Sequence, residues 1–482
     1  MQDVIKKVFH LIISRGINTL SGILLFVFAS RYLSLEEYAT FRQSFLPVDT
    51  LLPILSLGIP ETIYYILSKH YDKRAVIYDS LLLIFIMSFL FGLFLILGGA
   101  TFISYNFNNP LITKSIPWVI LYVMIYLPSQ LLIAFNIFNN NTKLVSFITS
   151  LSSLIVILTA IIYLSNEPRY IGIVIIKSVV PIISLVYLII FSQISLMRER
   201  INHYKMFFYA KDILRTSIPF GIGSILSGIS IQIDKLYVAT LTTPESYAIY
   251  ANGAIEIPLI GVITGSISSV LVSDMSLKIQ NGDIIGAKKL FETAASKSAL
   301  FLFPLLIFFA INAKSFMILL YSEKYIDSFI PFRILLLLLP IRIVVFGSAL
   351  IALGKSKVIL KRGFFELIFN IILSYILFKL IGVNGVALST VIVTYLWTVP
   401  LNLKEIATGF NVPYIDLFNL KVLSKIMLIC ISLSPIIIII NHLNLNNNIY
   451  LISSFIIYSL CVLYFYKRNE YLNFVNPIKF GK

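Results

Sequence analysis

Long apolar runs, separated by short polar segments, extend over most of the chain. The run from Leu81 to Leu97 is typical, because it is continuous and lacks the alternation over about ten residues that marks a strand of a membrane β-barrel. A helix needs about 20 mainly apolar residues to cross a bilayer. The pattern therefore predicts an all-α polytopic membrane protein.

We predict about 14 transmembrane helices, in two sets of six followed by two more. The first six lie near residues 11 to 33, 41 to 66, 78 to 104, 115 to 138, 142 to 164 and 169 to 192. The next six lie near 213 to 241, 247 to 272, 296 to 320, 331 to 353, 360 to 381 and 384 to 403. The last two lie near 424 to 441 and 449 to 466.

The two sets of six helices repeat one plan. Residues 34–41, Ser-Leu-Glu-Glu-Tyr-Ala-Thr-Phe, recur at 243–250 as Thr-Pro-Glu-Ser-Tyr-Ala-Ile-Tyr. Three further matches follow in the same order, at offsets between 209 and 214 residues: 116–121 with 330–335, 141–144 with 355–358, and 172–174 with 385–387. Two copies of a multi-helix unit in a membrane protein favour a transporter in which the halves rock about a site near the midplane.

The repeat also predicts the domain organisation. Residues 1–192 form an N-lobe of six spans, 193–212 a cytoplasmic linker, 213–407 a C-lobe of six spans, and 408–482 two extra helices with a cytoplasmic tail. Outside the spans, the segment 273–296 contains the turn signal Asn-Gly-Asp at 281–283, followed by an amphipathic stretch. We expect that stretch to lie along the membrane surface.

Composition and charge support this topology. With 58% hydrophobic residues, 12% charged residues and a mean hydropathy of +0.93, the chain is not a soluble globular protein. With the N-terminus inside, 27 of the 38 Lys and Arg residues lie at the cytoplasmic side, as short loops require. We therefore predict a multi-pass membrane protein with both termini cytoplasmic. Topology accounts for most of the net charge of +16, so no nucleic-acid partner is expected.

Polar and ionisable residues inside the spans fall on helical faces, chiefly in spans one, two, seven and eight. Such residues are costly in a bilayer and normally face a cavity or one another. The ionisable set is Arg15, Arg42, Asp49, Lys177, Asp234, Lys235, Glu256, Arg342 and Glu366. Two alternatives stay open: Arg15 and Arg42 lie near span ends, where they could extend to water, and Asp234 with Lys235 could serve in a structural ion pair.

Proline and glycine interrupt the same spans. We predict hinges at Pro53, Pro60, Pro219, Gly221, Gly228 and Pro258, because such residues bend membrane helices where a cavity or neighbours satisfy the freed backbone. The alternative is close helix packing through small residues. Cys430 and Cys461, in the last two spans, have no metal-ligand spacing, so we expect packing roles and no metal site.

Several motifs together resemble one known family. They are Arg-Tyr-Leu-Ser-Leu-Glu-Glu-Tyr at 31–38, Leu-Gly-Ile-Pro at 57–60, Ser-Ile-Pro-Phe-Gly at 217–221, Ile-Asp-Lys at 233–235, Tyr-Ser-Glu-Lys-Tyr at 321–325, and Gly-Val-Asn-Gly-Val-Ala at 382–387. The chain thereby resembles the bacterial polysaccharide-export flippases of the MOP superfamily, the Wzx-type O-unit translocases. The resemblance covers essentially the whole chain.

The resemblance implies two six-helix lobes around a central cavity. It implies translocation of an undecaprenyl-diphosphate-linked oligosaccharide from the cytoplasmic to the outer leaflet by alternating access. The product would serve the synthesis of a surface polysaccharide such as O-antigen, capsule or exopolysaccharide. Expected partners are the lipid-linked oligosaccharide, membrane lipids and the polysaccharide polymerase and export machinery. No cofactor is expected.

A diphosphate that leaves water needs cationic partners to offset its desolvation. The candidates are Arg15, Lys177, Lys235 and Arg342. Coupling to inward H⁺ or Na⁺ would need an acidic residue, for which Asp49 and Glu256 are the first candidates, followed by Asp234 and Glu366.

Other functions remain as alternatives. A multidrug or metabolite exporter of the MATE type shares the fold, although the basic set of residues suits an anionic cargo better than a cationic drug. Lipid II flippases usually carry an Arg-Asp pair after Gly-Phe near the end of the first helix, where this chain has Phe-Ala-Ser-Arg-Tyr at 28–32. A membrane polysaccharide polymerase is the least favoured, because the sequence shows no acid, base or metal-binding constellation on a large outer loop. We therefore expect a protein that is not an enzyme.

Overall fold

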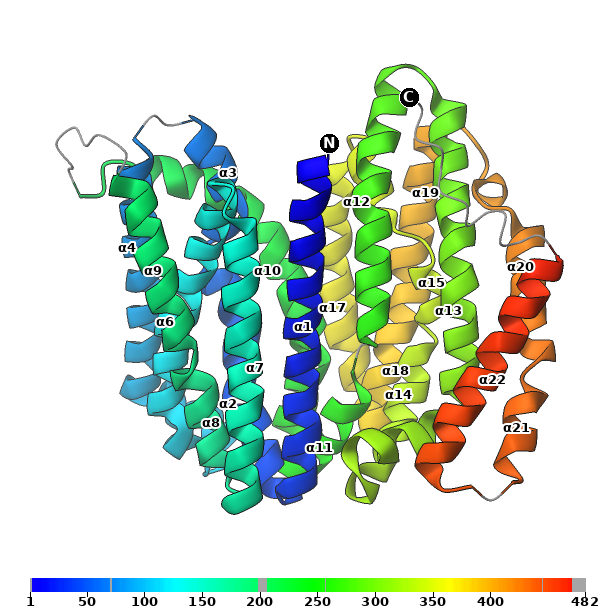
Figure 1. Cartoon of the computed structure of the whole chain (residues 1–482), viewed down its shortest axis with the longest axis horizontal. Coiled ribbons are helices and arrows are strands. Elements are labelled where there is room, and N and C mark those ends of the chain that lie inside the picture. The colour runs from blue at the N-terminus through cyan, green and yellow to red at the C-terminus, as the bar shows by residue number, and fades with distance from the viewer. Residues whose placement is uncertain (1, 70–71, 198–205, 256, 444, 470–482) are drawn as a thin grey trace. The chain divides into compact units, whose positions relative to one another are not determined.

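The computed structural model describes residues 2–69, 72–197, 206–255, 257–443 and 445–469, and all regular elements among them are helices (Figure 1). The chain forms two compact units, Met1–Ala248 and Ile249–Lys482.

The described residues of unit 1 form ten α-helices and the start of an eleventh. In chain order its described elements are α1 (Gln2–Tyr32), α2 (Leu35–Leu55), α3 (Ile59–Lys69), α4 (Lys73–Phe94), the π-helical turn η1 (Leu95–Gly99), α5 (Ala100–Asn106), α6 (Ile112–Phe138), α7 (Thr142–Asn166), α8 (Tyr170–Val179), α9 (Pro181–Met197), α10 (Ala210–Leu241) and the beginning of α11 (Pro244–Gly253).

Unit 2 begins within α11. Its further described elements are α12 (Pro258–Gln280), α13 (Ile284–Tyr321), the 3₁₀ turn η2 (Glu323–Ser328), α14 (Phe329–Leu336), α15 (Leu339–Arg342), α16 (Phe346–Ala352), α17 (Ser356–Ile381), α18 (Val383–Val393), the π-helical turn η3 (Thr394–Thr398), α19 (Val399–Phe410), the 3₁₀ turn η4 (Tyr414–Leu417), α20 (Leu420–Ser432), α21 (Pro435–Asn441) and α22 (Asn447–Arg468).

The membrane spans agree closely with the predicted ones. Among the described residues, 11 helical stretches are long and apolar enough to cross a membrane, and 13 if two bent pairs count as one span each. The bent pairs are Ala210–Pro219 with Gly221–Leu241, at 48°, and Glu323–Leu336 with Leu339–Ala352, at 47°. The predicted eighth span, near 247 to 272, falls on α11 and α12 and is not among the 13. The multi-pass helical fold is confirmed, while the exact count of 14 is not.

The contacts within unit 1 group α10 with α2 and α3. The predicted lobes 1–192 and 213–407 instead follow the sequence repeat, which assigns α10 to the second half. The two divisions rest on different observations, and the division by repeat stays a prediction. Most of the predicted linker, residues 198–205, lies outside the described residues.

The repeated segment marks a helix start in both copies. In the first copy, the Ser34 hydroxyl accepts a 3.2 Å hydrogen bond from the Glu37 N–H at the beginning of α2. In the second, the Thr243 hydroxyl accepts one of 3.3 Å from the Ser246 N–H, and Pro244 is the first residue of α11. Both are N-caps that satisfy N–H groups with no intrahelical partner.

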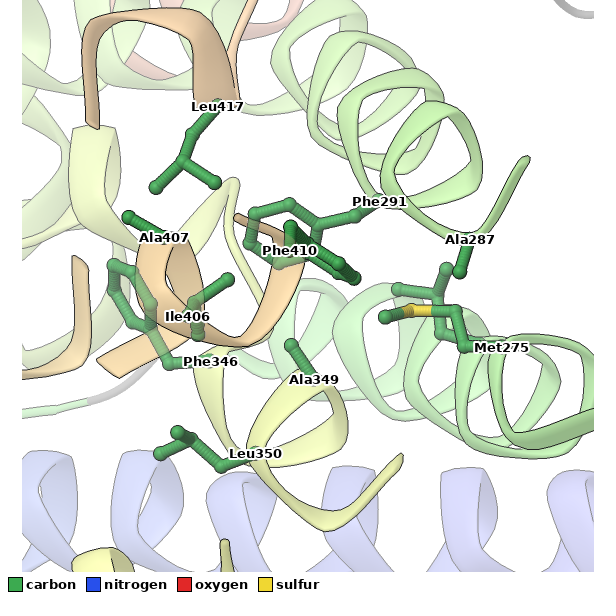
Figure 2. Close-up of a cluster of buried hydrophobic side chains, with 11 residues drawn as sticks. Met275, Ala287, Phe291, Phe346, Ala349, Leu350, Ile406, Ala407, Phe410 and Leu417 are labelled. Carbon is green, nitrogen blue, oxygen red and sulfur yellow. The ribbon is translucent and has the colours of Figure 1, made fainter. Parts of the chain in front are cut away.

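The stretch expected at the membrane surface belongs instead to a long helix, so that prediction was wrong. The turn at 281–283 is present, but α13 begins directly after it and continues to Tyr321. Ala287 and Phe291 lie in a buried apolar cluster with Phe346 of α16 and Phe410 of α19 (Figure 2). Burial of this apolar face against neighbouring helices replaces contact with lipid.

Asp283 caps α13 and binds back to α12. Its carboxylate lies 2.6 Å from Lys278 Nζ and accepts a 2.8 Å hydrogen bond from the Gly286 N–H. The Lys278 ammonium and this N–H hold the pKa of Asp283 below its usual range. The resulting stabilisation is therefore present above the pKa of the unfolded chain and is lost as the pH falls through the lower, folded value.

Phe291→Ala should destabilise unit 2. The side chain is 1% exposed within the cluster of Figure 2, and removal of a buried phenyl ring costs about 3 to 5 kcal/mol through lost contacts and a residual cavity. Thermal unfolding of the purified protein in detergent would measure the effect as a lower Tm. Phe301→Ala is the matched control, because Phe301 lies on the same helix and is 49% exposed. Equal Tm values for the two variants would contradict the assignment of this core.

Candidate functional site

Four of the predicted ionisable residues, Arg42 among them, meet in one cavity of unit 1. Asp49 of α2, Lys177 of α8 and Lys235 of α10 line a space of about 150 Å³. The remaining lining residues are Phe26, Phe41, Arg42, Phe45, Leu46, Gln232 and Tyr247. Residues from five helices, α1, α2, α8, α10 and α11, thus contribute to the wall, and all of them belong to unit 1.

Aromatic rings surround the Lys177 ammonium. Its Nζ lies 3.6 Å from the centroid of Phe45, 5.4 Å from that of Tyr122 and 5.8 Å from that of Phe41. The electron-rich faces of such rings attract a cation and replace part of its lost hydration, by about 0.5 to 2 kcal/mol per contact. The rings do not neutralise the charge, so Lys177 stays electrostatically able to attract an anion.

Arg42 reaches the same cavity from α2. Its guanidinium carbon lies 4.6 Å from the Phe26 ring centroid, and its Nη1 donates a 3.2 Å hydrogen bond to the Tyr38 hydroxyl. Arg42 and Asp49 are seven residues apart, which is about two turns, so both occupy one face of α2. Tyr38 and Tyr247 occupy equivalent positions in the sequence repeat, and both are almost fully buried in unit 1.

Lys235 is held by its own helix. Its ammonium donates a 3.4 Å hydrogen bond to Gln232 Oε1, one turn earlier on α10. Its backbone N–H donates a 2.8 Å hydrogen bond to Asp234 Oδ1. Asp234 is 8% exposed and does not line the cavity, so this carboxylate lies behind the wall that Lys235 forms.

The cavity carries an excess of positive charge. Among the described residues that line it, Arg42, Lys177 and Lys235 are cationic and Asp49 is the only carboxylate, which leaves a formal excess of two positive charges. Asp49 is exposed where it faces the cavity. Two ammonium groups and a guanidinium around a small space match an anion with several oxygen acceptors, such as a phosphate or diphosphate group.

Glycine and proline residues bring α2 and α10 close enough to form this wall. Between α2 and α3, Leu57 and Gly58 have φ values of 54° and 67°, which interrupt the helix within this span. A Cβ on Gly58 would lie 2.6 Å from Gly221 Cα, and a Cβ on Gly228 would lie 2.6 Å from Pro53 Cγ. These contacts support close helix packing, the alternative to a hinge, at Gly221 and Gly228 of α10. The 48° bend beside Pro219 is compatible with the predicted hinge, which stays a prediction.

The other predicted site residues lie elsewhere. Arg15 is exposed on α1 and does not line the cavity. Arg342, exposed at the end of α15, and Glu366, whose Oε2 lies 3.8 Å from Arg362 Nε, belong to unit 2. Glu256 lies outside the described residues. Among the predicted hinges, Pro60 is in the first turn of α3 and Pro258 is the first residue of α12.

A family comparison adds independent information. The sequence profile described as "Polysaccharide biosynthesis protein" matches residues 4–272, more than half of the chain. The chain belongs to this family. The matched region contains every described residue that lines the cavity. Comparison with curated proteins finds no match.

Solved structures show the same fold. A structure entitled "Lipid II flippase MurJ, inward closed conformation" superposes with a TM-score of 0.74 at 16% identity, over 95% of this chain and 98% of that one. An inward-facing multidrug resistance MATE transporter gives 0.61 at 16% identity, over 81% and 95%. A MOP superfamily transporter from Pyrococcus furiosus gives 0.60 at 12% identity, over 84% and 96%. The polysaccharide biosynthesis family member therefore has the MOP superfamily fold.

Several lining residues escaped the sequence analysis. Arg42 was predicted to share a helical face with Asp49, but extension to water was left open and Arg42 was not among the candidate cations. Gln232 lies one turn before Lys235, and Tyr247 belongs to the repeated segment, so their positions in the sequence could have identified both as lining residues. Phe26, Phe41 and Phe45 had none, because aromatic residues are abundant throughout the spans.

Gly228→Ala should weaken the packing of α2 against α10. The added methyl would meet the rigid Pro53 ring at 2.6 Å, so the helices must move apart, and misfit of this kind typically costs about 1 to 3 kcal/mol. A lower Tm of the purified protein would report the effect. Gly22→Ala is the matched control, because nothing lies within 4 Å of its Cβ position on α1. A Gly228→Ala variant as stable as the control would refute the contact.

Proposed function

We propose that this protein is a flippase that moves an undecaprenyl-diphosphate-linked oligosaccharide from the cytoplasmic to the outer leaflet for surface polysaccharide synthesis. The observation that carries the proposal is the cavity where Arg42, Lys177 and Lys235 face a single carboxylate among the described lining residues. It occurs in a multi-pass membrane protein of the polysaccharide biosynthesis family.

The cations offset the main physical cost of transport. A diphosphate taken from water into a region of low dielectric constant loses several kcal/mol of hydration per charge. Arg42 supplies a fork of parallel donors, while Lys177 and Lys235 supply compact charges on flexible stems. In this role Arg42 replaces Arg15 as the first arginine candidate, while Arg342 remains the proposed cation of unit 2.

The cavity is small relative to the whole cargo. Its volume of about 150 Å³ corresponds to roughly five water molecules at about 30 Å³ each. A diphosphate group fits such a space and an oligosaccharide does not. We therefore propose that this part of the site binds the diphosphate and that the sugars lie outside it.

Asp49 is the proposed coupling residue. It lines the same cavity as the three cations, where it can bind H⁺ or Na⁺ when the diphosphate is absent and compete with the diphosphate for these cations. Asp234 is a weaker candidate, because it already accepts a hydrogen bond from the Lys235 N–H. Glu366 lies beside Arg362 in unit 2. Because the membrane potential is negative inside, outward movement of the anion is electrically downhill by about 2.3 kcal/mol per charge per 100 mV.

Lipid II is the second candidate cargo. The fold matches that of a lipid II flippase at a TM-score of 0.74, and lipid II carries the same polyprenyl diphosphate. A cavity that recognises the diphosphate serves either lipid. The sugars therefore distinguish the two cargoes, and only a substrate comparison can assign them.

Loss of one lysine charge should impair transport in cells. In a strain without the gene, leaflet-selective labelling would locate the undecaprenyl-linked oligosaccharide, with and without the restored chain. Lys177→Met and Lys235→Met keep the apolar stem and remove the charge. We expect each to reduce the outer-leaflet signal about tenfold to a hundredfold, since a hydrogen bond to a charged group contributes about 1.5 to 3 kcal/mol.

Lys314→Met is the matched control, because Lys314 is exposed on α13 of unit 2 and should leave export unchanged. All variants need comparable amounts of protein in the membrane. Normal export by both cavity variants would refute the cavity. A normal leaflet distribution in the strain without the gene, with no redundant flippase present, would refute the cargo, and accumulation of lipid II instead would favour the second candidate.

Inorganic diphosphate should stabilise the purified protein, because a ligand that binds only the folded state raises the Tm by mass action. The shift should fall in Lys177→Met and persist in Lys314→Met. A lipophilic cation is the opposite probe and should give no shift. A shift with the cation but not with diphosphate would instead indicate an exporter of cationic compounds.

A further inference from the structure

A buried carboxylate holds the turn that leads into α10. Asp79, in the second turn of α4, is 0% exposed. Its Oδ1 accepts a 2.9 Å hydrogen bond from the Phe207 N–H, and its Oδ2 accepts one of 2.8 Å from the Tyr209 N–H. Two backbone donors on one carboxylate satisfy a charge that would otherwise be costly to bury. The turn at 206–209 is therefore fixed to α4.

The backbone of this turn is unusual. Phe207 has a φ of 64°, a left-handed conformation that is uncommon for a residue other than glycine. One of the two hydrogen bonds to Asp79 is donated by Phe207 itself and the other by Tyr209, two residues later, so they hold the turn in this conformation. A strained turn that is held from inside the protein presents its side chains outward in a defined direction.

Three large apolar side chains of the turn are exposed. Met206, Phe207 and Phe208 are 57%, 45% and 66% exposed. Exposed Lys211 and Arg215 follow on the first two turns of α10. Adjacent apolar and basic side chains are typical of segments that lie at the interface between acyl chains and anionic headgroups.

The geometry of α10 brings the turn to that interface. Its straight part, Gly221–Leu241, is about 32 Å long at about 1.5 Å per residue, which matches the roughly 30 Å hydrocarbon core of a bilayer. The preceding part, Ala210–Pro219, is inclined by 48° to it. The two parts count together as one candidate span, so the turn at 206–209, directly before Ala210, lies at one end of a membrane-crossing stretch.

We propose that Met206, Phe207 and Phe208 form a membrane anchor that inserts into the boundary between headgroups and acyl chains, and that Asp79 positions it. The occupant of this apolar surface is the lipid leaflet at the start of α10, which the proposed orientation makes the cytoplasmic one. The anchor ties the beginning of α10, the helix that carries Lys235, to both the membrane and α4. The proposal does not depend on the cargo.

Neighbouring contacts support a rigid base for the anchor. The Tyr78 hydroxyl, next to Asp79 in sequence, donates a 3.2 Å hydrogen bond to Gln193 Oε1 of α9 and accepts one of 3.3 Å from Arg74 Nε. The ends of α4 and α9 are thus joined beside the turn, within unit 1. The anchor therefore rests on two spanning helices.

Depth-dependent fluorescence quenching would test the proposal. The chain has two tryptophans, Trp118 and Trp397, which are first replaced by phenylalanine. Phe208→Trp then gives a reporter at the anchor. The full chain is reconstituted into anionic phospholipid vesicles with bromine near either the headgroup end or the methyl end of the acyl chains. We expect stronger quenching by bromine near the headgroup end.

Phe89→Trp provides the matched reporter, because Phe89 is 52% exposed in the middle of the span Lys73–Asn106 and should be quenched more strongly by the deep bromine. Asp79→Asn should reduce quenching at position 208 and leave that at position 89 unchanged. Where Asp79→Asn does not fold, Asp79→Glu shifts the carboxylate by one methylene and should have the same effect. No quenching at position 208 by either lipid would overturn the anchor. Unchanged quenching in a folded Asp79 variant would overturn the role of Asp79.

Discussion

A positive charge among apolar helices needs partners that replace water, and the partners of Lys177 determine what unit 1 can bind. Phe41, Phe45 and Tyr122 attract its ammonium through their ring faces. A carboxylate in direct contact would stabilise the lysine more strongly, but it would also cancel the charge. The aromatic rings stabilise the ammonium in a low-dielectric environment without neutralising its charge. The charge can therefore attract an anion into the cavity.

The cavity also depends on the close approach of two helices. Lys235 and Gln232 belong to α10, whereas Arg42 and Asp49 belong to α2. The turn at Leu57 and Gly58, which separates α2 from α3, lies against Gly221, and Pro53 lies against Gly228. A side chain at Gly221 or at Gly228 would separate the helices and move Lys235 away from Asp49. The same small residues that make the packing possible therefore set the distance between opposite walls of the site.

Four aspartates of this protein differ in what their oxygens face. Asp79, Asp234 and Asp283 each accept hydrogen bonds from backbone N–H groups, and so they stabilise a turn, a helix and a helix start. Asp49 instead faces the cavity with three cations on its walls. A carboxylate used by the backbone cannot also exchange partners during transport. This contrast is the structural reason for preferring Asp49 among the predicted acids.

The sequence alone determined the fold class and 13 of the predicted spans, because apolar runs of membrane length are properties of consecutive positions. It also identified Asp49, Lys177 and Lys235, since ionisable residues are rare in such runs. Only the tertiary structure decided which of these charges meet. Lys177 and Asp49 are 128 positions apart in the chain, and their proximity results from the packing of α2, α8 and α10. The aromatic surroundings of Lys177, the contact of Gly228 with Pro53 and the burial of α13's first turns likewise depend on neighbours from distant segments, which no local pattern specifies.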